Sequence, residues 1–283
     1  LDEIDISGFR VCLDSNWGAT SPFAKDLFKD LGVEVYSMND ELCGENINNS
    51  SFSDYCELRN KVVETSSSVG FAFDGDGDRV LVVDEAGNKL DGDDILAILA
   101  KHLLERQELS KKSIVTTQMS NLGFRASLEN MGIGIILTQI GDKNVLDTLI
   151  ENNLNLGGEQ TGHIIFLDYL PTPDGMLTAL QILKVMKETG LPLSQLAKVI
   201  KKMPQTVVNI PVRERINFEN ISSVSEQVNY FNSQLQDEGR VFLRYSRTED
   251  VARLKVEAKT ESLASQIANC IALLISGEIG LQA

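Results

Sequence analysis

The most restrictive feature of this sequence is an alternation of short apolar runs with helical patterns, which occurs twice in succession. The first series has apolar runs at 9–13, 33–36 and 69–73, with helical patterns at 22–31 and 55–64. The second has apolar runs at 114–117, 133–137 and 164–167, with helical patterns at 123–130 and 144–151. Strand, helix, strand order favours parallel strands joined by crossover helices. The sequence therefore predicts two similar α/β domains in tandem, with mixed, largely parallel sheets.

Two boundaries divide the chain. Asp91 to Asp94 precede an amphipathic pattern that reaches Leu104, as expected where a capped helix opens a new domain. After Pro204 the order becomes strand, helix, strand, strand, helix, which indicates a small α+β domain. We predict an α/β domain at 1–90, a second α/β domain at 91–203 and a C-terminal α+β domain at 204–283.

Composition excludes several classes of function. The chain has 26 Lys plus Arg against 41 Asp plus Glu, a formal net charge of −15, which repels nucleic acid. An anionic ligand therefore needs a local basic cluster. The cysteines form no C-x-x-C pair, so we expect neither a disulfide framework nor a zinc site. No apolar run approaches the roughly 18 residues of a membrane span, so we expect no membrane partner. A reducing cytoplasmic location fits this pattern best.

Three carboxylates alternate with glycine directly after the apolar run 69–73. Asp74, Asp76 and Asp78 lie at positions i, i+2 and i+4, so alternate side chains can converge on one point. Carboxylates crowded in this way repel one another unless a cation lies among them, and hard oxygen ligands favour Mg²⁺, Mn²⁺ or Ca²⁺. The sequence therefore predicts a metal site in this loop.

Two alternatives exist for the acidic loop. In an EF-hand, Glu85 would be the twelfth residue, but the required glycine at the sixth position is Arg79, and the flanking segments are strand-like where an EF-hand has helices. An acidic surface turn without metal is the other alternative, since Asp and Gly are common turn residues. Three alternating aspartates exceed what a turn requires, so we favour the metal site.

A second polar loop precedes the apolar run 164–167. It places Glu159, Thr161 and His163 at i, i+2 and i+4 within a glycine-rich segment. Glu and Thr suit the hydroxyl or amino groups of a sugar, and a histidine that titrates near neutral pH can move a proton during phosphoryl transfer. A glycine-rich loop with one histidine is more often structural when it is considered alone.

The basic cluster required by the acidic net charge lies near the C-terminus. It comprises Arg244, Ser246, Arg247 and Thr248, followed by Arg253, and it joins two predicted strands. Guanidinium and hydroxyl groups in one tight connection can hold a phosphate dianion by charge-assisted hydrogen bonds. The alternative is a solvated hairpin with ordinary surface arginines.

The acidic loop, followed by a predicted hairpin and Asp91-Gly92-Asp93, resembles the metal loop of the α-D-phosphohexomutases. This resemblance implies that Asp74, Asp76 and Asp78 bind Mg²⁺, with a phosphoserine of an upstream domain as the remaining key ligand. It also implies that Arg79 lies near the transferred phosphoryl group as a catalytic residue, where a fixed cation stabilises developing charge.

The other two loops carry the same resemblance. The second is similar to the family's Gly-Glu-x-Ser-Gly-His loop, which implies that Glu159 and Thr161 contact the sugar and that His163 is the general acid or base. Lys143 occupies the position of a basic cleft residue that is usually Arg in the glucosamine-type members. The basic cluster resembles the Arg-x-Ser-x-Thr phosphate-docking loop. Arg247 replaces a usual Gly or Asn there.

The resemblance covers nearly the whole chain. It implies reversible phosphoryl transfer between the 1- and 6-positions of a hexose through a 1,6-bisphosphate. Members acting on glucosamine phosphate are the most similar, with glucose and mannose phosphates as alternatives. The family's serine loop, Thr-Ala-Ser-His-Asn-Pro, does not occur in this sequence. We therefore expect a phosphoserine domain as partner and no mutase activity from this chain alone. Alternatives are a non-catalytic sugar-phosphate-binding protein and a calcium-binding module.

Overall fold

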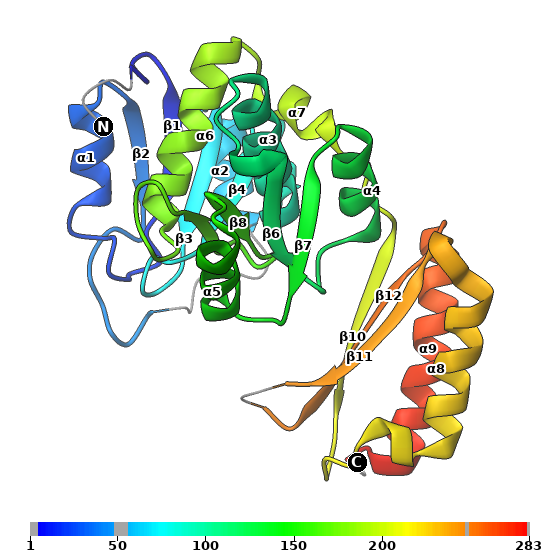
Figure 1. The fold of residues 1–283 in the computed structure, drawn as a ribbon. Coiled ribbons are helices and arrows are strands. Elements are labelled where there is room, and N and C mark those ends of the chain that lie inside the picture. The colour runs from blue at the N-terminus through cyan, green and yellow to red at the C-terminus, as the bar shows by residue number, and fades with distance from the viewer. Residues whose placement is uncertain (1–4, 48–55, 247–248, 282–283) are drawn as a thin grey trace. The chain divides into compact units, whose positions relative to one another are not determined.

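The computed structural model describes residues 5–47, 56–246 and 249–281 (Figure 1). Its contacts divide the chain into two compact units. The first runs to Ser120 and resumes at Phe124–Lys201, and the second comprises Asn121–Gly123 and the chain from Lys202 onward. Both predicted α/β domains thus lie within one unit, and the division at 90 and 203 into three domains stays a prediction.

The first sheet of this unit carries the acidic loop at the edge where its parallel strands end. The strand order is β2-β1-β3-β4-β5, with β1, β2 and β3 parallel and β4 and β5 antiparallel. All five residues of β3 are buried, as expected for a central strand packed on both faces. The bounds are β1 (Arg10–Asp14), α1 (Ala24–Asp30), β2 (Glu34–Met38), α2 (Cys56–Glu64), β3 (Val69–Phe73), β4 (Val80–Asp84) and β5 (Lys89–Leu90).

The second sheet repeats this plan. Its order is β7-β6-β8-β9, with β6 parallel to β7 and β8, and β9 antiparallel to β8. Each sheet therefore contains an antiparallel hairpin next to its parallel strands. The turn of the hairpin β3-β4 carries the acidic loop, and the turn of the hairpin β8-β9 carries the histidine loop. The bounds are β6 (Ser113–Thr117), α4 (Leu122–Asn130), β7 (Gly134–Thr138), α5 (Asp142–Asn152), β8 (Leu156–Gly158) and β9 (Ile164–Phe166).

Two long helices join the sheets into one core. α3 (Gly92–Glu105) begins with a capping box formed by Asp91 and Asp94, and α6 (Gly175–Thr189) is capped by the side chain of Asp174. Their buried apolar residues belong to the same hydrophobic cluster as side chains from both sheets. The short helix α7 (Leu193–Leu196) and a 3₁₀ turn at 197–199 follow. The predicted pair of similar α/β domains is confirmed.

The second unit is built on a three-stranded antiparallel sheet. The order is β10-β12-β11, and Ala252, Leu254 and Val256 of β12 share a core with the buried face of the last helix. This matches the predicted α+β architecture. The bounds are β10 (Gln205–Pro211), α8 (Ser222–Leu235), β11 (Arg240–Tyr245), β12 (Val251–Glu257) and α9 (Glu261–Ile279).

By length and composition alone, α9 could cross a membrane, contrary to the sequence-based expectation. Six of its residues with small or apolar side chains are buried: Ala264, Ile267, Ala268, Ile271, Ile275 and Ile279. The core helix of a folded domain passes the same test, so the observation is weak evidence for a membrane span.

Candidate functional site

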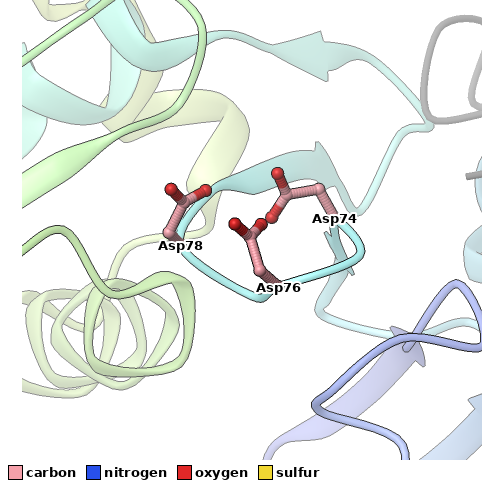
Figure 2. Close-up of side chains that lie close together, drawn as sticks. All are labelled: Asp74, Asp76 and Asp78. Atoms are coloured by element: carbon pink, nitrogen blue, oxygen red, sulfur yellow. The ribbon is translucent and has the colours of Figure 1, made fainter. Parts of the chain in front are cut away.

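The three aspartates of the acidic loop converge. Asp74, Asp76 and Asp78 lie in the turn that joins β3 to β4, and Figure 2 shows their carboxylates gathered together. One oxygen from each lies within 4.8 Å of the others. Asp74 is buried and Asp76 is exposed. The alternation therefore brings together three oxygen ligands of graded accessibility, as the sequence predicts.

Arg79 compensates the buried member of this group. Its Nε donates to Asp74 Oδ2 at 2.5 Å, and its backbone N–H donates to Asp74 Oδ1 at 3.1 Å. The same Nε lies 3.7 Å from Asp78 Oδ1. The guanidinium of Arg79, the predicted catalytic residue, therefore lies among the three carboxylates.

The pKa of Asp78 shows how crowded this loop is. It is raised from 3.8 to about 6: burial is the largest cause, repulsion from Asp74 and Asp76 adds to the rise, and His163 and Arg79 oppose it. Asp78 Oδ1 is buried without a hydrogen-bond partner, although His163 Nε2 lies 3.3 Å away, at ion-pair distance but without hydrogen-bond geometry. A buried carboxylate oxygen that lacks a hydrogen-bond partner and lies close to two further carboxylates fits a hard divalent cation such as Mg²⁺.

His163 links the acidic loop to the histidine loop. Its backbone forms an antiparallel bridge with Arg79, and its Nδ1 lies 3.0 Å from Glu159 Oε2. Burial lowers the pKa of the imidazole, but the Glu159 hydrogen bond and the charge of Asp78 outweigh burial and raise it overall. The two carboxylates therefore favour the protonated imidazole.

Glu159 is more enclosed than a side chain that only contacts a sugar needs to be. It is 5% exposed, and its Oε1 accepts the N–H of Gly141 at 2.9 Å. This bond fixes the start of α5, where Lys143 is exposed. Thr161 is also exposed, with its Oγ1 3.4 Å from His163 Nδ1. These placements are compatible with the predicted sugar-binding roles, which stay predictions.

Close backbone approaches hold the two hairpins together. Gly162 has φ of +101°, and a Cβ on it would lie 2.6 Å from the carbonyl oxygen of Val80. Gln160 donates to Asp91 Oδ2 at 3.3 Å and to Asp93 Oδ2 at 3.1 Å, which ties the histidine loop to the start of α3. Sequence reasoning missed Gln160, because a variable motif position gives no signal of a partner about seventy residues away.

The predicted phosphate-docking loop lies in the second unit, between β11 and β12. Arg244 pairs with Arg253 across the strands, and Ser246 is 3% exposed. Glu249 was not anticipated in this loop, and its Oε2 accepts from Arg253 Nη2 at 2.7 Å and from Ser246 Oγ at 3.4 Å. Arg247 and Thr248 lie outside the described residues.

The first unit thus combines three convergent carboxylates that can hold a cation, the guanidinium of Arg79 bound to one of them, and the imidazole of His163 between two carboxylates. Two α/β sheets bearing such hairpin loops, followed by a small antiparallel domain, define the fold of multidomain phosphosugar mutases. Solved structures share it. A phosphoglucomutase/phosphomannomutase family protein from Burkholderia thailandensis matches with a TM-score of 0.77 at 21% identity, covering 96% of this chain and 62% of that one.

A second solved structure has the same fold. N-acetylphosphoglucosamine mutase from Aspergillus fumigatus, in complex with GlcNAc-6P and magnesium, matches with a TM-score of 0.76 at 21% identity, covering 96% of this chain and 68% of that one.

The chain belongs to the phosphoglucomutase/phosphomannomutase family. Models of its α/β/α domain II, α/β/α domain III and C-terminal domain match residues 1–87, 91–203 and 207–274. The phosphoglucosamine mutase of Oceanobacillus iheyensis is 44% identical over 277 residues, covering 98% of this chain and 62% of the relative. That of Bacillus subtilis is 40% identical over 279 residues, covering 98% and 62%. The chain therefore spans less than two thirds of these relatives, and the sequence-based resemblance is confirmed.

Proposed function

We propose that this chain is the metal-binding, sugar-recognising and phosphate-docking part of a phosphoglucosamine mutase, which interconverts glucosamine 6-phosphate and glucosamine 1-phosphate through a 1,6-bisphosphate. The observation that carries the proposal is identity of 40 to 44% to phosphoglucosamine mutases over nearly all of this chain. The convergence of the acidic loop with Arg79 and His163 supports it independently.

Asp74, Asp76 and Asp78 would hold Mg²⁺, which when bound supplies a Lewis acid for phosphoryl transfer. Arg79, whose Nε now contacts Asp74, supplies a positive charge that can shift towards a phosphoryl group as the carboxylates take up the cation. His163 holds a proton between Glu159 and Asp78, so it can donate to or accept from a sugar hydroxyl.

Recognition of the substrate falls to three groups of residues in this proposal. Glu159 and Thr161 contact the sugar, and Lys143 adds a cation at the start of α5. Arg244, Ser246 and Arg253 dock the non-reacting phosphate, together with Arg247 and Thr248, which lie outside the described residues. Binding there requires the phosphate to displace Glu249 from Arg253, since both anions need the same guanidinium.

The phosphoryl donor is a phosphoserine on a further domain, whose freed serine hydroxyl takes a phosphoryl group back from the 1,6-bisphosphate. This chain alone turns over no substrate. Solved structures with the same fold include complexes with GlcNAc-6P and with glucose 1,6-bisphosphate. A cytoplasmic location completes the proposal.

The proposal is tested by isothermal titration of this chain with Mg²⁺ and then with glucosamine 6-phosphate, glucose 6-phosphate and mannose 6-phosphate. We expect Mg²⁺ binding that Asp76→Asn removes, and tighter binding of the glucosamine phosphate. Asp30→Asn, on the exposed end of α1, is the matched control. In the protein translated from the complete gene, Asp76→Asn should lower kcat much more than it raises KM. Equal kcat values of Asp76→Asn and the parent would exclude a metal-binding role for this loop.

A further inference from the structure

The turn that follows β1 has an unusual backbone. Asn16 and Trp17 are consecutive residues with φ of 52° and 54°, in the left-handed region. Asn adopts this conformation readily, but a bulky residue such as Trp rarely does, because its Cβ crowds the backbone. Trp17 is also the only tryptophan of the chain. A strained conformation of this kind persists only when the surrounding structure determines it.

Neighbouring backbone groups hold the turn in this conformation. The N–H of Trp17 donates to the carbonyl oxygen of Asn39 at 2.9 Å, and the N–H of Cys43 donates to the carbonyl oxygen of Trp17 at 3.2 Å. The buried Asp14 accepts from the N–H of Asn16 and from the side chain of Asn39, both at 2.9 Å. The turn is therefore anchored from two sides.

The far side of this turn lies against the acidic loop. Ala19 N–H donates to the carbonyl oxygen of Gly75 at 2.8 Å, and a Cβ on Gly18 would lie only 2.5 Å from that oxygen. A Cβ on Gly77 would lie 2.7 Å from the side chain of Thr20. Gly75 and Gly77 are the two residues that separate the three aspartates, so the turn contacts the acidic loop at its spacers.

We propose that the turn at 15–20 positions the acidic loop for its cation, and that Trp17 is a positioning residue through its left-handed backbone. This conformation brings Gly18 and Ala19 against Gly75, which fixes the peptide between Asp74 and Asp76 before the cation arrives. A loop ordered in advance loses less conformational entropy on binding, so the turn sets the affinity for Mg²⁺. The inference rests on the proposed metal role of the acidic loop.

The first test compares Mg²⁺ dissociation constants of glycine variants by isothermal titration. Gly18→Ala should weaken binding by about tenfold, the scale of effect seen when groups behind metal ligands are changed. Gly44→Ala is the matched control, because Gly44 is exposed and a Cβ there meets nothing within 4 Å. It should bind as the parent does. Parent-like affinity of Gly18→Ala would overturn the proposal.

Substitutions of Trp17 separate its backbone from its indole ring. Trp17→Asn should keep the parent affinity, because Asn tolerates positive φ, whereas Trp17→Val should weaken binding, because a β-branched residue opposes that conformation. A merely structural role of the ring would make both variants equally weak. That outcome would contradict the proposal.

A measurement without metal distinguishes this inference from the proposed function. The N–H groups of Gly77 and Arg79 donate to Asp74 within the acidic loop, to its carbonyl oxygen and its Oδ1. In Gly18→Ala these amides should exchange with deuterium faster than in the parent, while the amides of β10 in the other unit keep their rates. Unchanged exchange in the acidic loop overturns the inference. Faster exchange in Gly18→Ala, together with a parent chain that does not bind Mg²⁺, would show that the turn orders the acidic loop but would refute the proposed metal site.

Discussion

Replacing Asp78 by Asn should stabilise the metal-free chain, although it should abolish metal binding. The pKa of Asp78 is raised from 3.8 to about 6, with burial as the largest cause. The folded state therefore binds a proton at this carboxyl more tightly than the unfolded state does. By linkage, ionised Asp78 costs stability above pH 6, and the cost shrinks as the pH falls from 6 towards 3.8. Asn keeps the shape without the charge.

The magnitude follows from the shift. About two pKa units at about 1.4 kcal/mol each give an upper value of about 3 kcal/mol at pH 8. The side chain is 32% exposed, so solvent screening reduces this. We expect Asp78→Asn to gain about 1 to 2 kcal/mol in the free energy of unfolding, which for a unit of this size is about 2 to 8 °C in Tm.

Thermal unfolding in EDTA measures this gain. The gap between Asp78→Asn and the parent should be full at pH 8 and fall to about half at pH 5, where the parent carboxyl is mostly protonated. Saturating Mg²⁺ should reverse the order, because only the parent then gains stability by binding. Asp30→Asn controls for the change in net charge. An Asp78→Asn variant less stable than the parent in EDTA at pH 8 would refute the reasoning.

Three further predictions concern the same charges and the second unit. The Mg²⁺ dissociation constant should rise about tenfold from pH 7 to pH 5, because the cation competes with a proton on Asp78, and a flat profile in isothermal titration would contradict this. Arg79→Met should tighten Mg²⁺ binding in the same assay, because the guanidinium competes for the carboxylates, and weaker binding would exclude that competition. Glu257→Gln should destabilise the second unit by about 3 kcal/mol, because it removes the buried carboxylate that forms ion pairs with Lys255 and Arg240. Burial raises the pKa of Glu257, but Lys255 and Arg240 outweigh burial and lower it overall. The stability that ionised Glu257 contributes should therefore be lost as the pH falls below about 4.5, which urea unfolding of parent and variant at several pH values would show.

The sequence predicted what depends on local periodicity. Strands and helices with regular apolar spacing were placed correctly, and the convergence of Asp74, Asp76 and Asp78 follows from alternation along one turn. The strand β8 was not predicted. Its three residues include two glycines, and it forms because its backbone pairs with β6 on one side and β9 on the other, a tertiary effect.

Contacts between segments that are far apart in the chain could not be predicted from the sequence. His163 meets Asp78 only because the two hairpins lie together, and Glu159 is buried where its carboxylate accepts the N–H of Gly141. In the sequence, Glu249 is one acidic residue among several in a charged loop. Its contact with Arg253 becomes evident only in the structure. Such pairings depend on how sheets pack, which no short motif encodes.

The charges around the acidic loop suit a divalent cation better than a monovalent one. Four carboxylates, Asp74, Asp76, Asp78 and Glu159, lie with two cations, Arg79 and protonated His163. The two cations offset part of this charge, but two negative charges remain. Burial is the largest cause of the raised pKa of Asp78, and repulsion from Asp74 and Asp76 adds to it. A divalent cation neutralises two charges, whereas a further lysine or arginine would neutralise only one. In the proposed function, Arg79 Nε would release Asp74 Oδ2 for the cation, so cation binding would free the guanidinium for a phosphoryl group.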